Sequence, residues 1–162
     1  MSVESVKKYL NQWGRGKDVK EFESSSATVE LAAQVAGVVP GRIAKTLSFK
    51  SGEGCLLLVT AGDSRVNNAA FRARFGHKAK MLCPDETLAF TGHAVGGVSP
   101  FALPECVERP VSVYLDESMK RFHTVFPACG SAHSAIELTC DDLFLYSRAM
   151  DWVAVCTLQH HE

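Results

Sequence analysis

A nearly unbroken apolar run at residues 55–60, CLLLVT, constrains the fold of this chain more than any other stretch. Such a run is typical of a central strand that is covered on both faces of a sheet. Residues 45–50, KTLSFK, alternate between polar and apolar side chains like a second strand, and SGEG at 51–54 is a hairpin-type connection. We therefore expect an antiparallel pair of strands that runs through the core.

The rest of the chain alternates between helix-like and strand-like segments. Apolar spacing and cap residues predict helices at 2–13, 28–36, 64–75 and 84–91, a short one at 117–121, and one that starts after Thr139. Further strands are expected at 19–22, 78–82, 111–115, 123–129, 136–138 and 152–156. These elements indicate an α+β (mixed α/β) fold, in which helices flank a curved or barrel-like, mainly antiparallel sheet.

The composition, with 46% hydrophobic and 22% charged residues among 162, is that of one ordinary globular domain. We expect this domain to cover residues 1–156, and residues 157–162 to form a disordered tail. Because no apolar run approaches the ~20 residues of a membrane span and the first residues lack an apolar signal core, we expect a cytoplasmic protein without a membrane partner. Six cysteines without a C-x-x-C pair are expected to be reduced thiols.

The sequence GGVSP that begins at Gly96 is expected to form a stiff loop. Gly96 and Gly97 permit positive φ and close approach to a bulky group, and Pro100 biases Ser99 toward an extended conformation. The amides of Gly97, Val98 and Ser99 are therefore not expected to pair within a helix. Free amides on a rigid loop suit a carbonyl or phosphate oxygen, although a glycine pair alone also fits an ordinary tight turn.

The segment between Asp63 and Asp85 contains basic residues and no acidic ones. The basic residues are Arg65, Arg72, Arg74, Lys78 and Lys80. Arg65 and Arg72 would share a face of the expected helix. Such a run fits either a solvated surface or a landing area for nucleic-acid phosphates. The formal net charge of -1 excludes a chain whose whole surface is basic, but it leaves room for a local basic patch.

Other catalytic patterns are weak or missing. Gly97-Val98-Ser99 begins like the nucleophile elbow of a serine esterase, but the elbow requires a glycine where Phe101 stands. The histidines lack the spacing of metal ligands, and a glycine fingerprint for phosphate or dinucleotide binding is missing. The scattered histidines are His77, His93, His123 and His133. We therefore expect neither a metal nor an organic cofactor.

Four segments are the most distinctive in their order and spacing: TVELAA at 28–33, GRIAKTL at 41–47, TGHAVGGVSPF at 91–101 and AIELT at 135–139. Together they resemble the YbaK/ProX family of free-standing aminoacyl-tRNA editing proteins, which is related to the insertion domain of bacterial prolyl-tRNA synthetase. The resemblance covers roughly residues 2–156. Its most specific parts are the lysine followed by Thr-Leu and the G-x-x-x-P loop.

The resemblance implies which residues form the site. Lys45 corresponds to the family's essential lysine and GGVSP to its G-x-x-x-P loop, so the expected catalytic residues are Lys45, Gly96, Gly97, Val98, Ser99 and Pro100. The expected substrate-binding residues are Phe22, Ser25, Thr28 and the small-residue turn Gly130 and Ser131. The expected tRNA-binding residues are Arg42, Arg65, Arg72, Arg74, Lys78 and Lys80.

The resemblance also implies a function, that of a trans-editing aminoacyl-tRNA deacylase. Its substrate would be a mischarged tRNA, such as tRNA-Pro carrying alanine, cysteine or serine, and its partners the tRNA acceptor end and an aminoacyl-tRNA synthetase. An aminoacyl ester is already activated, so the protein mainly has to position water and stabilise an oxyanion. In the family, a ribose hydroxyl of the substrate helps to activate that water. Two alternatives stay open: a noncatalytic module of the same fold that binds a tRNA end or an amino-acid analogue, and a serine esterase that uses Ser99.

Overall fold

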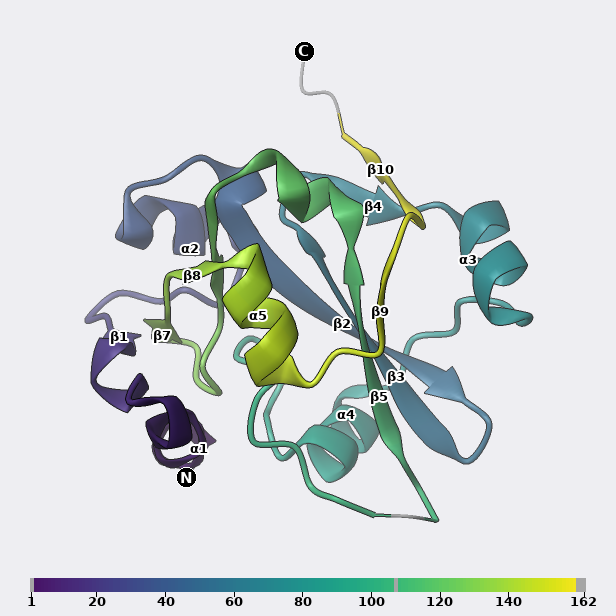
Figure 1. Cartoon of the computed structure of the whole chain (residues 1–162), viewed down its shortest axis with the longest axis horizontal. Helices are drawn as coiled ribbons and strands as arrows, with labels where there is room; N and C mark the ends of the chain where they lie inside the picture. The colour runs from purple at the N-terminus through teal and green to yellow at the C-terminus, as the bar shows by residue number, and fades with distance from the viewer. Residues whose placement is uncertain (1, 107, 160–162) are drawn as a thin grey trace.

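The buried strand β3 (Gly54–Ala61) lies at the centre of the computed structural model, which describes residues 2–106 and 108–159 (Figure 1). It pairs antiparallel with β2 (Ile43–Ser51), and Lys45 lies opposite Thr60. Every residue of β3 is buried, as expected for a strand that is covered on both faces. The predicted pair of strands through the core is therefore confirmed.

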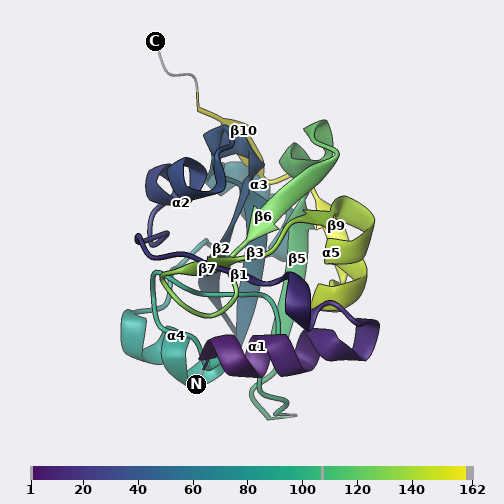
Figure 2. The ribbon, with the colours of Figure 1, turned by 90° about the vertical axis from the view of Figure 1, so that its left-hand side faces the viewer.

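The central sheet has the strand order β8-β6-β2-β3-β5-β9. Its other strands are β5 (Val111–Asp116), β6 (Thr124–Pro127), β8 (Leu138–Thr139) and β9 (Asp151–Val153). Pairing is antiparallel between β2 and β3 and between β6 and β8, but parallel between β2 and β6, β3 and β5, and β5 and β9. Figures 1 and 2 show a strongly twisted sheet with helices around it, so the α+β class with a curved sheet is confirmed, although the central sheet is mixed and not mainly antiparallel.

Two short strand pairs lie beside the central sheet. β1 (Lys20–Glu21) pairs with β7 (Ser134–Ala135), and β4 (Ser64–Val66) pairs with β10 (Cys156–Leu158), both antiparallel. The predicted disordered tail is therefore wrong for Thr157 and Leu158, because both belong to β10 and pair with β4. The remaining tail residues from 160 onward lie outside the described residues.

The helix predicted over residues 64–75 begins later than expected. Helix α3 spans Asn68–Phe75, and the side chain of Asn67 caps it by accepting the N–H of Ala70 at 2.9 Å. This cap fixes the start of the helix, and β10 offers the preceding residues a strand partner. Arg65 and Arg72 therefore do not share a helix face, because Arg65 belongs to β4.

Three predicted strands differ in detail from the observed ones. Residues 78–82 form no regular strand but one isolated bridge, between Met81 and Phe49 of β2. In place of the strand predicted at 136–138 there are two short strands, β7 before Ile136 and β8 from Leu138 onward. The strand predicted at 152–156 is divided between β9 and β10. In each case the segment bends to meet a partner that is distant in sequence.

The remaining helices are α1 (Ser2–Leu10), α2 (Val29–Ala36), α4 (Pro84–Thr91) and α5 (Cys140–Ser147), with 3-10 turns at Asn11–Trp13, Gly16–Asp18, Pro40–Arg42 and Glu117–Arg121. Thr28 caps α2 by accepting the N–H of Leu31 at 3.2 Å, and Thr139 caps α5 by accepting the N–H of Asp142 at 3.1 Å. Both caps confirm predictions. Within residues 2–106 and 108–159, each helix is too short or too polar to cross a bilayer.

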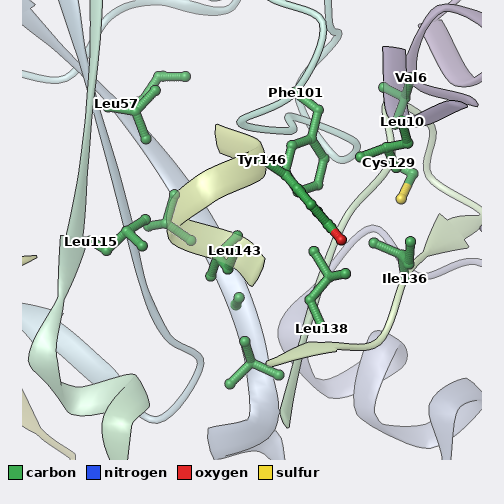
Figure 3. Packing of buried hydrophobic residues seen from close by; sticks show 14 of the residues in the cluster. Val6, Leu10, Leu57, Phe101, Leu115, Cys129, Ile136, Leu138, Leu143 and Tyr146 are labelled. Carbon is green, nitrogen blue, oxygen red and sulfur yellow. The ribbon is translucent and has the colours of Figure 1, made fainter. Parts of the chain in front are cut away.

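Strand β3 separates two apolar clusters, because successive side chains of a strand point to opposite faces of the sheet. Leu57 packs on one face with Leu10 of α1 and Leu143 of α5 (Figure 3). Leu58 packs on the other face, in the cluster that contains Phe71 of α3. One strand thus anchors helices on both faces, which makes β2 and its pairing with β3 a rigid base for the site.

Replacing Leu57 by alanine tests this arrangement. Leu57 is fully buried, so Leu57→Ala is expected to lower the free energy of unfolding by ~2 to 5 kcal/mol. Leu145→Ala, a change of the same size at a side chain that is 56% exposed, is the control and should change it by less than ~0.5 kcal/mol. Urea unfolding measures both, and equal losses for the two variants would contradict a doubly covered β3.

Candidate active site

A cavity of about 430 Å³ opens beside the outer edge of β2. Its walls come from the residues that lead into α2, from β2 itself, from the start of α4 and from a glycine loop (residues 95–98). Figure 2 shows α2 and α4 one above the other on this side of β2. The lining residues with the most chemical interest are Ser26, Thr28, Lys45, Thr46, Gly96 and Val98.

The outer edge of β2 has partners near both ends but is open in the middle. Ala44 pairs with Pro127 of β6, and the carbonyl of Ser48 accepts the N–H of Leu82 at 3.0 Å. Within the described chain, no strand pairs with this edge between those two points. Strand backbone groups alternate in direction, so the N–H and C=O of Thr46 point to the same side as the carbonyl of Ser48. The open edge therefore offers a peptide donor and acceptor to a ligand in the cavity.

Lys45 is partly buried where β2 borders the cavity. Its ammonium donates a hydrogen bond to the backbone carbonyl of Ser64. Desolvation lowers the pKa of Lys45 below its ordinary value, and the nearby Cys156 and Asp63 oppose that effect. A partly desolvated ammonium interacts more strongly with a ligand oxygen than a fully solvated one does.

The carbonyl that accepts from Lys45 is itself held in place. Ser64 Oγ donates to the carbonyl of Ala61 at 2.7 Å and lies 2.7 Å from Thr60 Oγ1. The backbone of Ser64 is paired with Leu158 of β10. Strand β10 thus helps to position the lysine, a role that the sequence did not reveal because the segment resembles a polar tail.

The glycine loop packs against the turn that contains Ser131. A Cβ added to Gly97 would lie 2.6 Å from the Cα of Ser131, and Gly96 has a φ of +100°, so neither position tolerates a side chain. The N–H of Gly97 donates to the carbonyl of Ala94 at 3.1 Å, and is therefore not available to a ligand as the sequence suggested. Among the described residues, the N–H of Val98 has no partner, and Val98 lines the cavity.

His93 fixes the glycine loop from beneath. The ring is buried, Nε2 lies 2.8 Å from the carbonyl of Phe101, and Nδ1 lies 2.9 Å from Ser2 Oγ. A carbonyl only accepts, so Nε2 carries the proton, and the hydroxyl proton of Ser2 is shared between Nδ1 and the carbonyl of Gly92, 2.6 Å away. Burial lowers the pKa of His93, and the bond to Phe101 opposes this. The neutral ring therefore ties helix α1 to both ends of the loop.

Residues 23–145 match the family model for the aminoacyl-tRNA editing domain. The chain belongs to the aminoacyl-tRNA editing domain family. The resemblance to YbaK/ProX proteins that the sequence motifs suggested is thereby confirmed. The matched segment includes the α2 start, β2, α4 and the glycine loop, which together surround the cavity.

Relatives of this editing domain are found alone and inside larger enzymes. The chain is 53% identical over 157 residues to the uncharacterized protein YwhH of Bacillus subtilis, and the alignment covers 96% of this chain and 98% of that protein. It is 31% identical over 97 residues to the proline–tRNA ligase of Thermotoga maritima, and this alignment covers 59% of this chain and 17% of the ligase. A solved structure of a candidate trans-editing enzyme for prolyl tRNA synthetase is similar with a TM-score of 0.85 and 27% identity, over 96% of this chain and 97% of that one.

The expected catalytic residues of this editing domain differ in their position relative to the cavity. Lys45, Gly96 and Val98 line the cavity together. Gly97 supports the loop from behind, against the turn at Ser131. Pro100 borders a different hollow and does not line the cavity.

Ser99 does not have the surroundings of a catalytic nucleophile. It is fully buried, and its Oγ accepts the N–H of Phe101 at 3.2 Å. Both ring nitrogens of His93 are bonded to other groups, which argues against the serine esterase alternative, since that chemistry needs a base beside the hydroxyl. Among the described residues, no three His, Cys, Asp or Glu side chains gather closely enough to hold a metal ion.

The expected substrate-binding residues are only partly brought together. Thr28 lines the cavity, and Ser131 supports it through a 2.9 Å hydrogen bond to Ser134, which also lines it. Gly130 packs beneath the loop against Ser2 and His93. Phe22 does not line the cavity itself but packs on the apolar cluster beside α2, whose members Ala32, Ile43, Phe126 and Ala135 do.

Ser26, and not its neighbour Ser25, lines the cavity. Ser25 Oγ accepts the N–H of Ala27 at 3.1 Å, whereas Ser26 Oγ is buried without a partner among the described residues, as is Thr46 Oγ1. The run of serines does not distinguish the two positions. Their directions are set by a long-range bond of 2.6 Å from the N–H of Ser26 to the carbonyl of Ala132.

Two of the basic residues expected to bind tRNA make structural contacts. Arg42 donates to the carbonyl of Thr124 at 3.1 Å and to the carboxylate of Glu137 at 3.1 Å. Arg74 pairs with Asp151 at 3.4 Å. The partners of Arg42 use much of the hydrogen-bonding capacity of its guanidinium group, whereas among the described residues Arg74 has one longer hydrogen bond, to Asp151.

The other four basic residues are on the open surface. Arg72 and Lys78 line one shallow hollow beside α3, and Arg65 and Lys80 are exposed. Figure 1 shows α3 across the molecule from α2. The basic surface is therefore separate from the cavity, and only Lys80, next to the cavity-lining Met81, lies close to the cavity.

The buried His93 predicts a pH dependence of stability. Its pKa is lowered in the fold from an ordinary value of 6.5, so the unfolded chain binds the proton more readily, and the stabilising contribution is lost as pH falls below 6.5. Between about pH 7.5 and about pH 5.5, the free energy of unfolding measured in urea should fall more for the wild type than for His93→Gln. The glutamine keeps a donor for Phe101 but does not titrate. His123→Gln, at an exposed histidine, is the control and should behave like the wild type.

Proposed function

We propose that the protein is a trans-editing deacylase that hydrolyses the ester bond of a mischarged aminoacyl-tRNA. The observation that carries the proposal is the common cavity lined by Lys45, Gly96 and Val98 in a chain of the aminoacyl-tRNA editing domain family. At about 430 Å³, the cavity has the size of a small-molecule site. It suits the esterified end of a tRNA, with the rest of the nucleic acid outside.

The proposed reaction needs no covalent bond to the protein. Water adds to the ester carbonyl carbon, and the tetrahedral oxyanion then collapses as the bond to the ribose oxygen breaks and that oxygen takes up a proton. The N–H of Val98 and the ammonium of Lys45 are the donors for the developing negative charge. We assign activation of the water to the neighbouring ribose hydroxyl, because Ser99 and His93 are engaged within the fold.

The proposed substrate is tRNA-Pro that carries a small amino acid. The similarity to a proline–tRNA ligase and to a candidate trans-editing enzyme for prolyl tRNA synthetase supports the prolyl system. Methyl-sized side chains on the cavity wall support a small amino acid: Ala27, Ala32, Ala44, Ala128 and Ala135. The implied partners are the tRNA acceptor end and a synthetase, and the implied compartment is the cytoplasm, where tRNA is charged.

Removal of the lysine ammonium tests the reaction directly. Lys45→Ala is expected to lower kcat for deacylation of Ala- or Ser-charged tRNA-Pro by ~10² to 10³-fold, as loss of one oxyanion donor does. Lys50→Ala is the matched control, because Lys50 is an exposed lysine of the same strand. Single-turnover hydrolysis of labelled aminoacyl-tRNA measures all three proteins.

Two results would refute the deacylase proposal. If the wild type leaves every charged tRNA intact while binding it, the protein is the noncatalytic module that the sequence also allowed. If Lys45→Ala retains near-normal turnover in a fold with unchanged circular dichroism, the lysine has no part in the chemistry.

Salt dependence tests the basic surface beside α3. If Arg72 and Lys78 contact phosphates, replacing both by alanine should reduce the slope of log Kd against log salt by ~1.4 to 1.8. Lys17→Ala, an exposed lysine near α1, is the control and should leave the slope unchanged. Filter binding of tRNA over a range of salt concentrations gives the slopes, and an unchanged slope in the double variant would exclude this surface from tRNA binding.

A further inference from the structure

Six side-chain hydroxyls line the cavity, and four of them have partners within the fold. Thr28 Oγ1 caps α2, Ser48 Oγ and Thr87 Oγ1 lie 2.8 Å apart, and Ser134 Oγ is bonded to Ser131. The other two, Ser26 Oγ and Thr46 Oγ1, are buried and have no partner among the described residues. A buried hydroxyl without a partner is disfavoured, so both point to a ligand that completes them.

The backbone of Ser26 is held by a contact that is distant in sequence. Its backbone N–H is bonded to the carbonyl of Ala132 at 2.6 Å, and the residue is only 8% exposed. Thr46, in contrast, follows Lys45 on the open edge of β2, beside the groups that we assign to the ester. Ser26 is therefore the hydroxyl that remains for the side chain of the esterified amino acid.

We propose that Ser26 is a specificity-determining residue that selects a β-hydroxy amino acid, serine or threonine, over alanine. This inference rests on the proposed deacylase function and narrows its substrate. A serine hydroxyl that reaches Ser26 Oγ can donate to it or accept from it. An alanine methyl group leaves the hydroxyl unpaired.

The expected discrimination follows from general rules of polar recognition. A site built around a hydrogen bond rejects an analogue that lacks the group more strongly than an apolar pocket rejects a missing methylene. The serine ester gains one neutral hydrogen bond, whereas the alanine ester leaves Ser26 Oγ unpaired. This difference corresponds to a preference for the serine ester of roughly 10- to 100-fold in kcat/KM. The methyl-sized walls of the cavity leave room for the β-carbon and for the additional methyl group of threonine.

The experiment compares tRNA-Pro carrying serine, threonine or alanine as substrates for the wild type, Ser26→Ala and Ser25→Ala. The wild type should hydrolyse the serine and threonine esters at least ~10-fold more efficiently than the alanine ester. Ser26→Ala should lose this preference mainly through slower hydrolysis of the hydroxyl esters, with the alanine ester unaffected or faster. Ser25→Ala is the matched control and should keep the preference, because Ser25 Oγ is bonded to Ala27 and does not line the cavity.

Several outcomes overturn the inference. A wild type that prefers alanine, or treats the esters alike, refutes it even if no variant folds. An equal loss on all three esters in Ser26→Ala means that the hydroxyl contacts the adenosine that they share. Preservation of the serine preference in a folded Ser26→Ala means that the hydroxyl binds only water. If the reaction still depends on Lys45 in these cases, the proposed function survives; hydrolysis that does not depend on Lys45 refutes both.

Discussion

The incomplete pairing of the outer edge of β2, which has partners near both ends but none in the middle, is the constraint on which the site depends. Strand β3 is buried on both faces and occupies the inner edge of β2, so β2 is held firmly while its outer edge is open at Thr46. Segments that are far apart in sequence meet at that edge: the α2 entrance, the start of α4 and the glycine loop. The cavity is thus a gap in the strand pairing along this edge of the sheet.

The charge of Lys45 is oriented without being neutralised. Its hydrogen-bond partner is a peptide carbonyl, and among the described residues no carboxylate lies within ion-pair distance of it. A carboxylate would fix the side chain equally well but would cancel most of its field at a nearby ligand. The carbonyl of Ser64 therefore provides position while the positive charge remains available to an oxyanion.

The sequence was most informative where structure is local. The apolar run of β3, the caps Thr28 and Thr139 and the antiparallel pairing of β2 with β3 all follow from residues close in sequence. The cavity position of Ser26 and the strand β10 did not, because each depends on a partner far along the chain. The start of α3 is set by the local cap Asn67, which the predicted helix over 64–75 included as an interior residue. The family motifs located Lys45 and the glycine loop, but not the fact that the amide of Gly97 is bonded within the loop.

Strand β10 gives the site a weak point that the core does not share. It is three residues long, lies at the periphery and meets β4 across a wide gap in sequence, as the register of Cys156 with Val66 shows. Short peripheral pairings of this kind close late during folding and open first in native-state fluctuations. Detachment of β10 would remove the backbone support of Ser64 and the contact of Cys156 with the cluster around Phe71, but not the hydroxyl bonds of Ser64 to Ala61 and Thr60. The support of Lys45 therefore combines a short peripheral strand pairing with the buried hydroxyl bonds of Ser64.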